Sequence, residues 1–145
     1  MSRLKIQFFF EDISYTIKHK ARVREWIADA IRDEAYELKQ LNFIFCNDSY
    51  LLSINQSYLK HDTYTDIITF DNSEIKGEIL GDIFISIDRI RENAKNFEVP
   101  ETDELHRVMI HGTLHLLGYK DKTNREKVIM TKKEDFYLSM RLFKI

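Results

Sequence analysis

The sequence contains very little cysteine, glycine or proline, and each shortage excludes something. Its 145 residues include one cysteine, four glycines and one proline. Cys46 alone cannot form a disulfide within the chain, and because it lies in a segment with the pattern of a strand, we expect a buried free thiol. So few glycines and prolines leave little room for long flexible linkers. We therefore expect one domain that spans residues 1–145.

Long apolar segments are also absent. The longest apolar runs, such as residues 8–10 and 41–46, are far shorter than the ~20 residues that a membrane-spanning helix needs. Residues 1–5 lack the apolar stretch and the small-residue cleavage site of a signal peptide. Together with the lone cysteine, these absences predict a cytoplasmic protein that does not contact a membrane.

Charge of one sign does not dominate the whole chain, although it does so locally. The formal net charge is −2, which excludes a uniformly basic nucleic-acid-binding protein. Residues 120–145, however, carry eight lysines and arginines against four acids, and a second basic cluster lies at residues 18–24. Both clusters are compatible with a solvated helix face, and the first would also suit a polyanionic substrate.

Hydrophobic periodicity predicts an alternation of strands and helices. The segments with the apolar, β-rich pattern of strands are 3–10, 41–46, 67–70 and 77–87. The segments with helical spacing or helix-start signals are 18–38, 48–58, 88–97, a helix that begins near Pro100, and 125–143. We therefore expect an α+β fold, a single domain in which a small mixed sheet of about four strands packs against about five helices.

Two histidines four residues apart, His111 and His115, are the most informative pair in the chain. On a helix they point the same way, about 40° apart around the axis and about 6 Å along it, so both can bind one metal ion. Gly118 can adopt the positive φ that ends a helix, after which the chain can turn back and offer Asp121 as a third ligand. Three protein ligands with an open fourth position are typical of a catalytic metal site.

The spacing of these residues is also that of the metzincin metalloproteases, with one difference. Their general base, a glutamate directly after the first histidine, is replaced by Gly112. The sequence therefore predicts a hydrolytic metal site without the protease base. Glu104 is the candidate catalytic residue, because it lies seven residues before His111 on nearly the same helix face. A salt bridge between Glu104 and Arg107, or a complement to the helix dipole, explains this glutamate equally well.

Each candidate also has a purely structural explanation. Two histidines at this spacing on an apolar helix can be packed core residues, and Asp121 can be a solvated turn acid. Asp66 and Asp82 are compatible both with carboxylates that support a metal site and with caps or turns. The remaining histidines, expected to be surface or structural residues, are His19, His61 and His106.

Three blocks of the sequence carry a resemblance to a known family. They are INQSY at 54–58 followed by TDIITF at 65–70, LGDIFIS at 80–86, and HGTLHLLGYKD at 111–121. These blocks are similar to the motifs LN-x-x-Y…TDVLSF, LGDI-I-S and HGxLHLxGYDH of the bacterial YbeY endoribonucleases, also known as rRNA maturation factors. The combination is far more specific than any one motif, and the order of expected elements fits the family over nearly the whole chain.

The resemblance implies a metal-dependent, single-strand-specific endoribonuclease that acts in maturation of the small-subunit rRNA 3′ end and in ribosome quality control. The implied cofactor is Zn²⁺, one per chain, held by His111, His115 and Asp121, with another divalent metal as the alternative. The implied partners are single-stranded RNA or rRNA and the ribosome or small-subunit assembly proteins. Two other functions stay open: a metallohydrolase of another substrate class such as peptides, and a non-catalytic ribosome assembly factor braced by its metal.

The chain departs from the family pattern at positions that matter for the site. Asp121 stands where the family commonly has a histidine, which lowers the net charge of the site and predicts more tolerance for oxygen-preferring metals such as manganese. Leu59 stands where arginine is usual, so a phosphate contact would fall to Lys60 as a point charge. The candidate RNA-binding residues are Lys60, Lys120 and Lys122.

Overall fold

A four-stranded mixed sheet forms the centre of the fold. The computed structural model describes residues 4–59 and 66–141, and the elements below refer to that part of the chain. The strands are β1 (Ile6–Phe10), β2 (Glu37–Cys46), β3 (Ile67–Asp71) and β4 (Glu78–Ser86). The helices are α1 (Lys20–Asp33), α2 (Asp48–Ile54), the short π-helix η1 (Asn55–Leu59), α3 (Ile87–Phe97), α4 (Glu101–Leu116) and α5 (Asn124–Ser139). The predicted α+β fold is confirmed.

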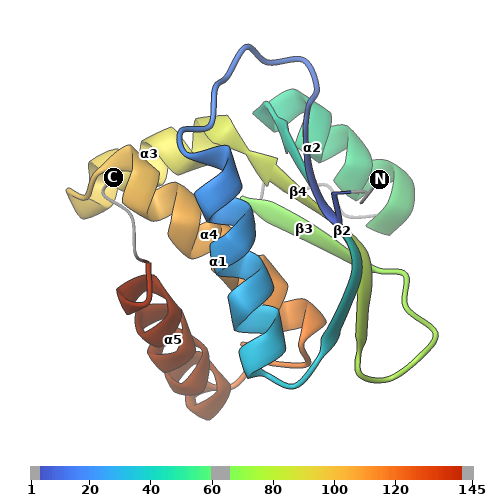
Figure 1. The fold of residues 1–145 in the computed structure, drawn as a ribbon. Coiled ribbons are helices and arrows are strands. Elements are labelled where there is room, and N and C mark those ends of the chain that lie inside the picture. The colour runs from blue at the N-terminus through green and yellow to red at the C-terminus, as the bar shows by residue number, and fades with distance from the viewer. Residues whose placement is uncertain (1–3, 60–65, 142–145) are drawn as a thin grey trace.

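The sheet has the strand order β1-β2-β4-β3. β1, β2 and β4 run parallel, whereas β3 joins the edge antiparallel to β4. Parallel neighbours need a crossover connection, and α1 provides the one between β1 and β2. Figure 1 shows α1 and α4 on one side of the sheet and α2 on the other, with α5 on the side of α1 and α4 that lies away from the strands.

The main core lies between the sheet and the layer that contains α1 and α4. Phe43 and Phe45 of β2 and Ile83 and Ile85 of β4 are fully buried in it, at alternate positions of their strands. Residues between them, such as Phe84, belong to a second, smaller cluster beneath α2. Because successive side chains of a strand point to opposite faces, the central strands are covered on both sides.

The expected helix at 18–38 is wrong at its C-terminal end. α1 stops at Asp33, and Ala35 takes a positive φ of 63°. Leu38 lies instead in β2, where it is paired with Ile79 of β4. The helical spacing of Leu38 is therefore coincidental, because the backbone pairing between two strands overrides the local pattern.

Two simpler observations complete the fold. Cys46 is fully buried, as expected, and burial raises the pKa of its thiol to about 12. Among the helices of residues 4–59 and 66–141, none combines the length and apolar character that a membrane crossing requires.

α4 is the helix that carries the predicted histidine pair. It begins after Pro100, and acids in its first turn, Glu101, Asp103 and Glu104, complement the positive end of the helix dipole. Ten of its sixteen residues are buried, since α1, α3, α5 and the sheet all contact it. A helix held on so many sides offers its remaining partly exposed side chains from a rigid base.

Candidate metal centre

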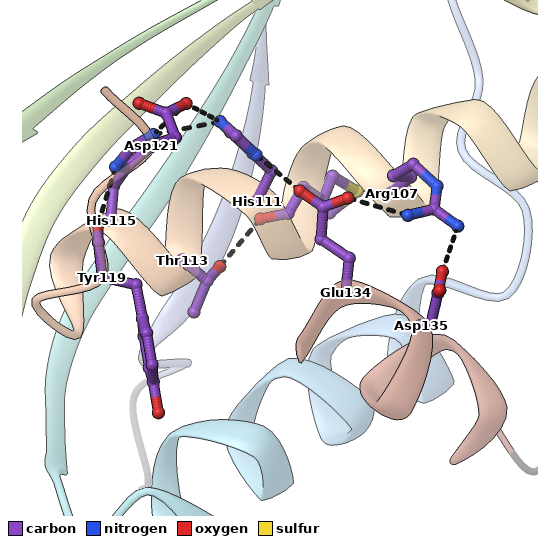
Figure 2. A network of polar contacts seen from close by, with 9 residues as sticks. Arg107, His111, Thr113, His115, Tyr119, Asp121, Glu134 and Asp135 are labelled. Carbon is purple, nitrogen blue, oxygen red and sulfur yellow. Dashed lines mark hydrogen bonds and ion pairs between the residues drawn. The ribbon is translucent and has the colours of Figure 1, made fainter. Parts of the chain in front are cut away.

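The three predicted ligands converge at the C-terminal end of α4 (Figure 2). His111 Nε2 and His115 Nε2 lie 3.0 Å apart, and Asp121 Oδ2 lies 3.2 Å and 3.3 Å from them. The ligand atoms of a tetrahedral ion with bonds of about 2 Å are separated by roughly 3.3 Å. Two imidazole nitrogens and one carboxylate oxygen therefore fit one divalent ion such as zinc. All three side chains are partly exposed, so a fourth ligand can enter from solvent.

The end of α4 brings Asp121 back toward the histidines. Gly118 has a φ of +100°, the value that the sequence required of it. The N–H of Gly118 donates to the carbonyl of His115, and the N–H of Tyr119 donates to the carbonyl of Leu114, both at 3.0 Å. This pair of bonds is a Schellman motif, which satisfies the last helical carbonyls while it reverses the chain. The local sequence therefore accounts for the return of the third candidate ligand.

Each histidine is oriented by a partner on its Nδ1 atom. His111 Nδ1 lies 2.6 Å from Glu134 Oε2, and His115 Nδ1 lies 3.0 Å from the carbonyl oxygen of Tyr119. A carbonyl or a carboxylate oxygen accepts here, so each Nδ1 carries a proton, and in the neutral imidazole the lone pair is then on Nε2. Both Nε2 atoms face Asp121 (Figure 2). This is the arrangement that a metal ligand needs.

Glu134 is the neighbour of the histidines that sequence reasoning missed. It comes from α5, and its second oxygen accepts a hydrogen bond from Arg107 at 2.7 Å. The other guanidinium nitrogen of Arg107 donates to the exposed Asp135, also at 2.7 Å. No spacing rule connects Glu134 to the histidine motif, because only the packing of α5 against α4 brings them together. The one sequence feature that pointed toward Glu134 is that acidic side chains interrupt the basic segment 120–145.

The charges around the site favour a cation. Burial by itself would lower the pKa of His111, but the hydrogen bond and charge of Glu134, followed by the charges of Asp121 and Asp66, raise it above its ordinary value. A metal ion that binds here displaces a proton that these carboxylates otherwise attract. Asp66 therefore belongs to the electrostatic surroundings of the site. Asp82 instead accepts hydrogen bonds from Asn42 and Asn72, so these contacts account for Asp82 as a structural residue.

Glu104 does not hold either histidine among the contacts that the structure describes. Its side chain is buried and hydrogen-bonds to Asn93, and burial raises its pKa. The ion pairs described for Arg107 go to Glu134 and Asp135. The orienting role considered for Glu104 is thus filled by Glu134, and a role in proton transfer stays a prediction.

Two of the three candidate RNA-binding lysines lie within the described residues. Lys120 and Lys122 are exposed and flank Asp121 directly in the sequence. Lys60 lies outside the described residues. A role of these lysines in RNA binding stays a prediction.

Gly112 occupies the position at which the metzincin proteases have their general base, a glutamate. A Cβ atom at this position would lie 2.7 Å from Ile67 Cδ1 and 3.1 Å from Ile83 Cγ2. Separations under about 3 Å force a neighbour to move, so a larger side chain here would have to displace the sheet residues. The helix face after His111 is therefore in contact with the sheet, and a glutamate could not extend from it toward the metal position without that displacement.

The structure is that of a small α+β protein in which two histidines and one carboxylate at the end of a buried helix could hold a metal ion. A family model described as Endoribonuclease YbeY matches residues 7–141. The chain belongs to this family.

Individual relatives and one solved structure agree with that assignment. A Cytophaga hutchinsonii protein named endoribonuclease YbeY is 54% identical over 143 residues, which cover 99% of this chain and 100% of that protein. A Flavobacterium psychrophilum protein of the same name is 49% identical and covers 93% of this chain and 95% of its own length. A solution structure from Thermotoga maritima has a TM-score of 0.64 at 25% identity and covers 92% of this chain and 87% of its own.

Proposed function

We propose that this protein is a metal-dependent, single-strand-specific endoribonuclease that acts in maturation of the small-subunit rRNA 3′ end and in ribosome quality control. The observation that carries the proposal is the convergence of His111 Nε2, His115 Nε2 and Asp121 Oδ2 within 3.3 Å of one another. Such a centre, in a chain of the endoribonuclease YbeY family, supports phosphodiester cleavage as the reaction.

The metal that we propose is Zn²⁺, one ion per chain, with His111, His115 and Asp121 as ligands. Two imidazoles and a carboxylate are a donor set typical of catalytic zinc, and the carboxylate also suits manganese. When bound, the ion would supply Lewis-acid chemistry by neutralising charge on the scissile phosphate.

The surrounding residues have supporting roles in this proposal. Glu134 and the Tyr119 carbonyl hold the imidazoles in one tautomer, so that both Nε2 atoms stay directed at the ion. Lys120 and Lys122 attract the RNA backbone as exposed point charges. Glu104 is the candidate for proton transfer, since a buried carboxyl group with a raised pKa holds its proton closer to neutral pH.

The partners in this proposal are single-stranded RNA, including rRNA, and the ribosome or small-subunit assembly proteins, and the compartment is the cytoplasm. A net charge of −2 leaves the molecule without a general affinity for nucleic acid. Binding of RNA then depends on the local basic segment beside the metal centre.

The test combines metal content with cleavage of defined substrates. Purified protein, stripped of metal and then reloaded with Zn²⁺ or Mn²⁺, is assayed on labelled single-stranded RNA, on the same RNA in a duplex, and on casein. We expect about one metal ion per chain and cleavage of the single strand only. A variant with both His111→Ala and His115→Ala serves as the control and should have neither property.

Two outcomes would replace the proposal. Cleavage of casein without cleavage of RNA would favour a metallohydrolase of peptides. Metal binding without any cleavage, in a protein whose double-histidine variant still supports ribosome maturation in cells, would favour the non-catalytic assembly factor.

A further inference from the structure

A second polar cluster lies behind the metal centre, at the C-terminal end of α1. Its centre is Glu34, the residue that directly follows the helix. Glu34 Oε1 accepts a hydrogen bond from the Tyr119 hydroxyl at 2.7 Å, and Oε2 accepts one from Lys133 Nζ at 2.9 Å. The Tyr137 hydroxyl also donates to Oε2. One carboxylate therefore joins α1 to α5 and to the segment that follows α4.

Glu34 is well suited to hold these donors. Its side chain is only 12% exposed. Burial alone would raise its pKa, but the hydrogen bonds from Tyr137, Tyr119 and Lys133 lower the pKa below its ordinary value. The carboxylate is therefore charged at neutral pH, and charge-assisted hydrogen bonds are the stronger kind.

Tyr119 connects this cluster to the metal centre. Its hydroxyl donates a hydrogen bond to Glu34, while its backbone carbonyl accepts one from Nδ1 of His115 at 3.0 Å. Tyr119 also lies two residues before Asp121, in the segment that follows α4. The position of one tyrosine thus bears on two of the three proposed ligands, His115 through a hydrogen bond and Asp121 through the chain.

The two histidines are consequently supported by neighbouring residues of α5. Glu134 reaches His111 directly. Lys133 binds Glu34, and its ammonium group lies 5.5 Å from the centroid of the Tyr119 ring, within the range of a cation–π contact. One hydrogen bond, from Nδ1 to Glu134, holds His111. His115 is held by the carbonyl of Tyr119, and the Tyr119 hydroxyl is held in turn by Glu34 at the end of α1.

We propose that Glu34 is a positioning residue of the metal centre, which acts through Tyr119 to hold His115 and Asp121 in the geometry of ligands. The proposal rests on the proposed function, because it assumes that these side chains bind a metal. The alternative is that Glu34 only ties α1 to α5. Asp33 provides the comparison, because it accepts a hydrogen bond from the Tyr137 hydroxyl at 2.8 Å and has no described contact with Tyr119.

Three variants separate the two roles: Glu34→Ala, Tyr119→Phe, and Asp33→Ala as the matched control. Zinc affinity is measured by competition with a chromophoric chelator, and the free energy of unfolding is measured on the metal-free proteins. We expect Glu34→Ala and Tyr119→Phe each to weaken zinc binding about tenfold, the lower end of the effect of losing an outer partner of a ligand. Asp33→Ala should stay within about twofold of the natural protein, and the variant with both Glu34→Ala and Tyr119→Phe should bind no more weakly than Glu34→Ala alone.

An NMR measurement on the metal-free proteins gives a readout that a merely structural role would not change. The ¹⁵N shifts of the His115 imidazole report its tautomer, and we expect them to move toward a mixture of tautomers in Glu34→Ala and Tyr119→Phe. The shifts of His111, which Glu134 supports independently, should not move.

The outcomes are distinguishable. If the natural protein binds zinc and Tyr119→Phe and Glu34→Ala bind it equally well, the positioning role is wrong while the proposed function stands. The same holds if Asp33→Ala weakens binding as much as Glu34→Ala. A natural protein that binds no zinc or manganese would overturn the proposed function and this inference together. Should Glu34→Ala fail to fold, Tyr119→Phe decides alone, since it removes one hydroxyl and leaves the carbonyl and the ring.

Discussion

Helix α4 carries histidines in two contrasting environments. At the middle of the helix, His106 is 1% exposed, its ring lies 5.5 Å from that of Trp26, and its Nδ1 accepts a hydrogen bond from Arg141 at 2.9 Å. At the C-terminal end, His111 and His115 are partly exposed and their Nδ1 atoms donate to oxygen acceptors. His106 lies only five positions before His111 in the sequence.

The difference shows that the partner of Nδ1 decides whether a histidine can serve as a metal ligand. A guanidinium occupies the lone pair of His106 and, together with burial as the larger cause, lowers the pKa of His106 to about 4. The carboxylate of Glu134 accepts a hydrogen bond from Nδ1 of His111, so Nε2 is the nitrogen through which His111 can bind a metal. The first histidine is a neutral core residue, as expected for a structural residue, and the second has the properties of a ligand.

The largest expected effect is the loss of metal binding when a proposed ligand, His111, is removed. His111→Ala should abolish zinc binding and RNA cleavage, a loss greater than the ten- to hundredfold cost of removing an outer partner. His106→Ala should instead keep its zinc affinity and lose about 3 kcal/mol of unfolding free energy, because it leaves a cavity beside Trp26. Zinc titration and denaturant unfolding of both variants test this difference between the two histidines. Loss of zinc binding in His106→Ala would contradict it.

The next effect is the pH dependence that His106 imposes on stability. Its pKa rises from about 4 in the folded chain to 6.5 in the unfolded chain, so the unfolded state binds a proton first as the pH falls. The stabilisation is fully present above pH 6.5 and is lost toward pH 4, by about 3 kcal/mol over the whole window. The charged groups that face His106 are Arg141, Asp103 and His19.

The measurement compares unfolding free energies of the natural protein and His106→Gln at pH 7 and pH 4.5. Carboxylates titrate in both proteins, so the difference between them isolates His106. Parallel pH profiles for the two proteins would show that His106 does not titrate in this way.

A smaller effect is expected from the partner of His111. Glu134→Gln removes the charge behind the imidazole and should weaken zinc binding ten- to hundredfold. Asp135→Asn is the matched control, because Asp135 binds the same Arg107 and does not contact His111. Zinc competition assays on both variants test the role of Glu134, and equal losses would assign the effect to Arg107 instead.

The smallest effect concerns the identity of the third ligand. Asp121→His replaces an anionic oxygen by a neutral nitrogen, so the ratio of zinc to manganese affinity should rise by about tenfold. Competition between the two metals in the natural protein and the variant measures that ratio. An unchanged ratio would mean that Asp121 does not reach the ion.

Sequence reasoning was successful where the determinants are local. The helical spacing of His111 and His115 and the positive φ of Gly118 follow from nearby residues, and the structure has both. It was wrong at Leu38, where pairing with a strand distant in sequence overrode an apolar spacing that also fits a helix. It also selected Glu104 instead of Glu134, because residues on the same helix are visible in the sequence and residues on a packed helix are not.

The sequence by itself determined the class of chemistry, since side-chain type, helical period and the backbone freedom of one glycine suffice to place three donors near one point. Only the tertiary structure decided how those donors are oriented. Glu134 lies beside His111, and Glu34 beside Tyr119, because α1, α4 and α5 pack together. Interactions between helices depend on distances through space, and no regular spacing along a chain encodes them.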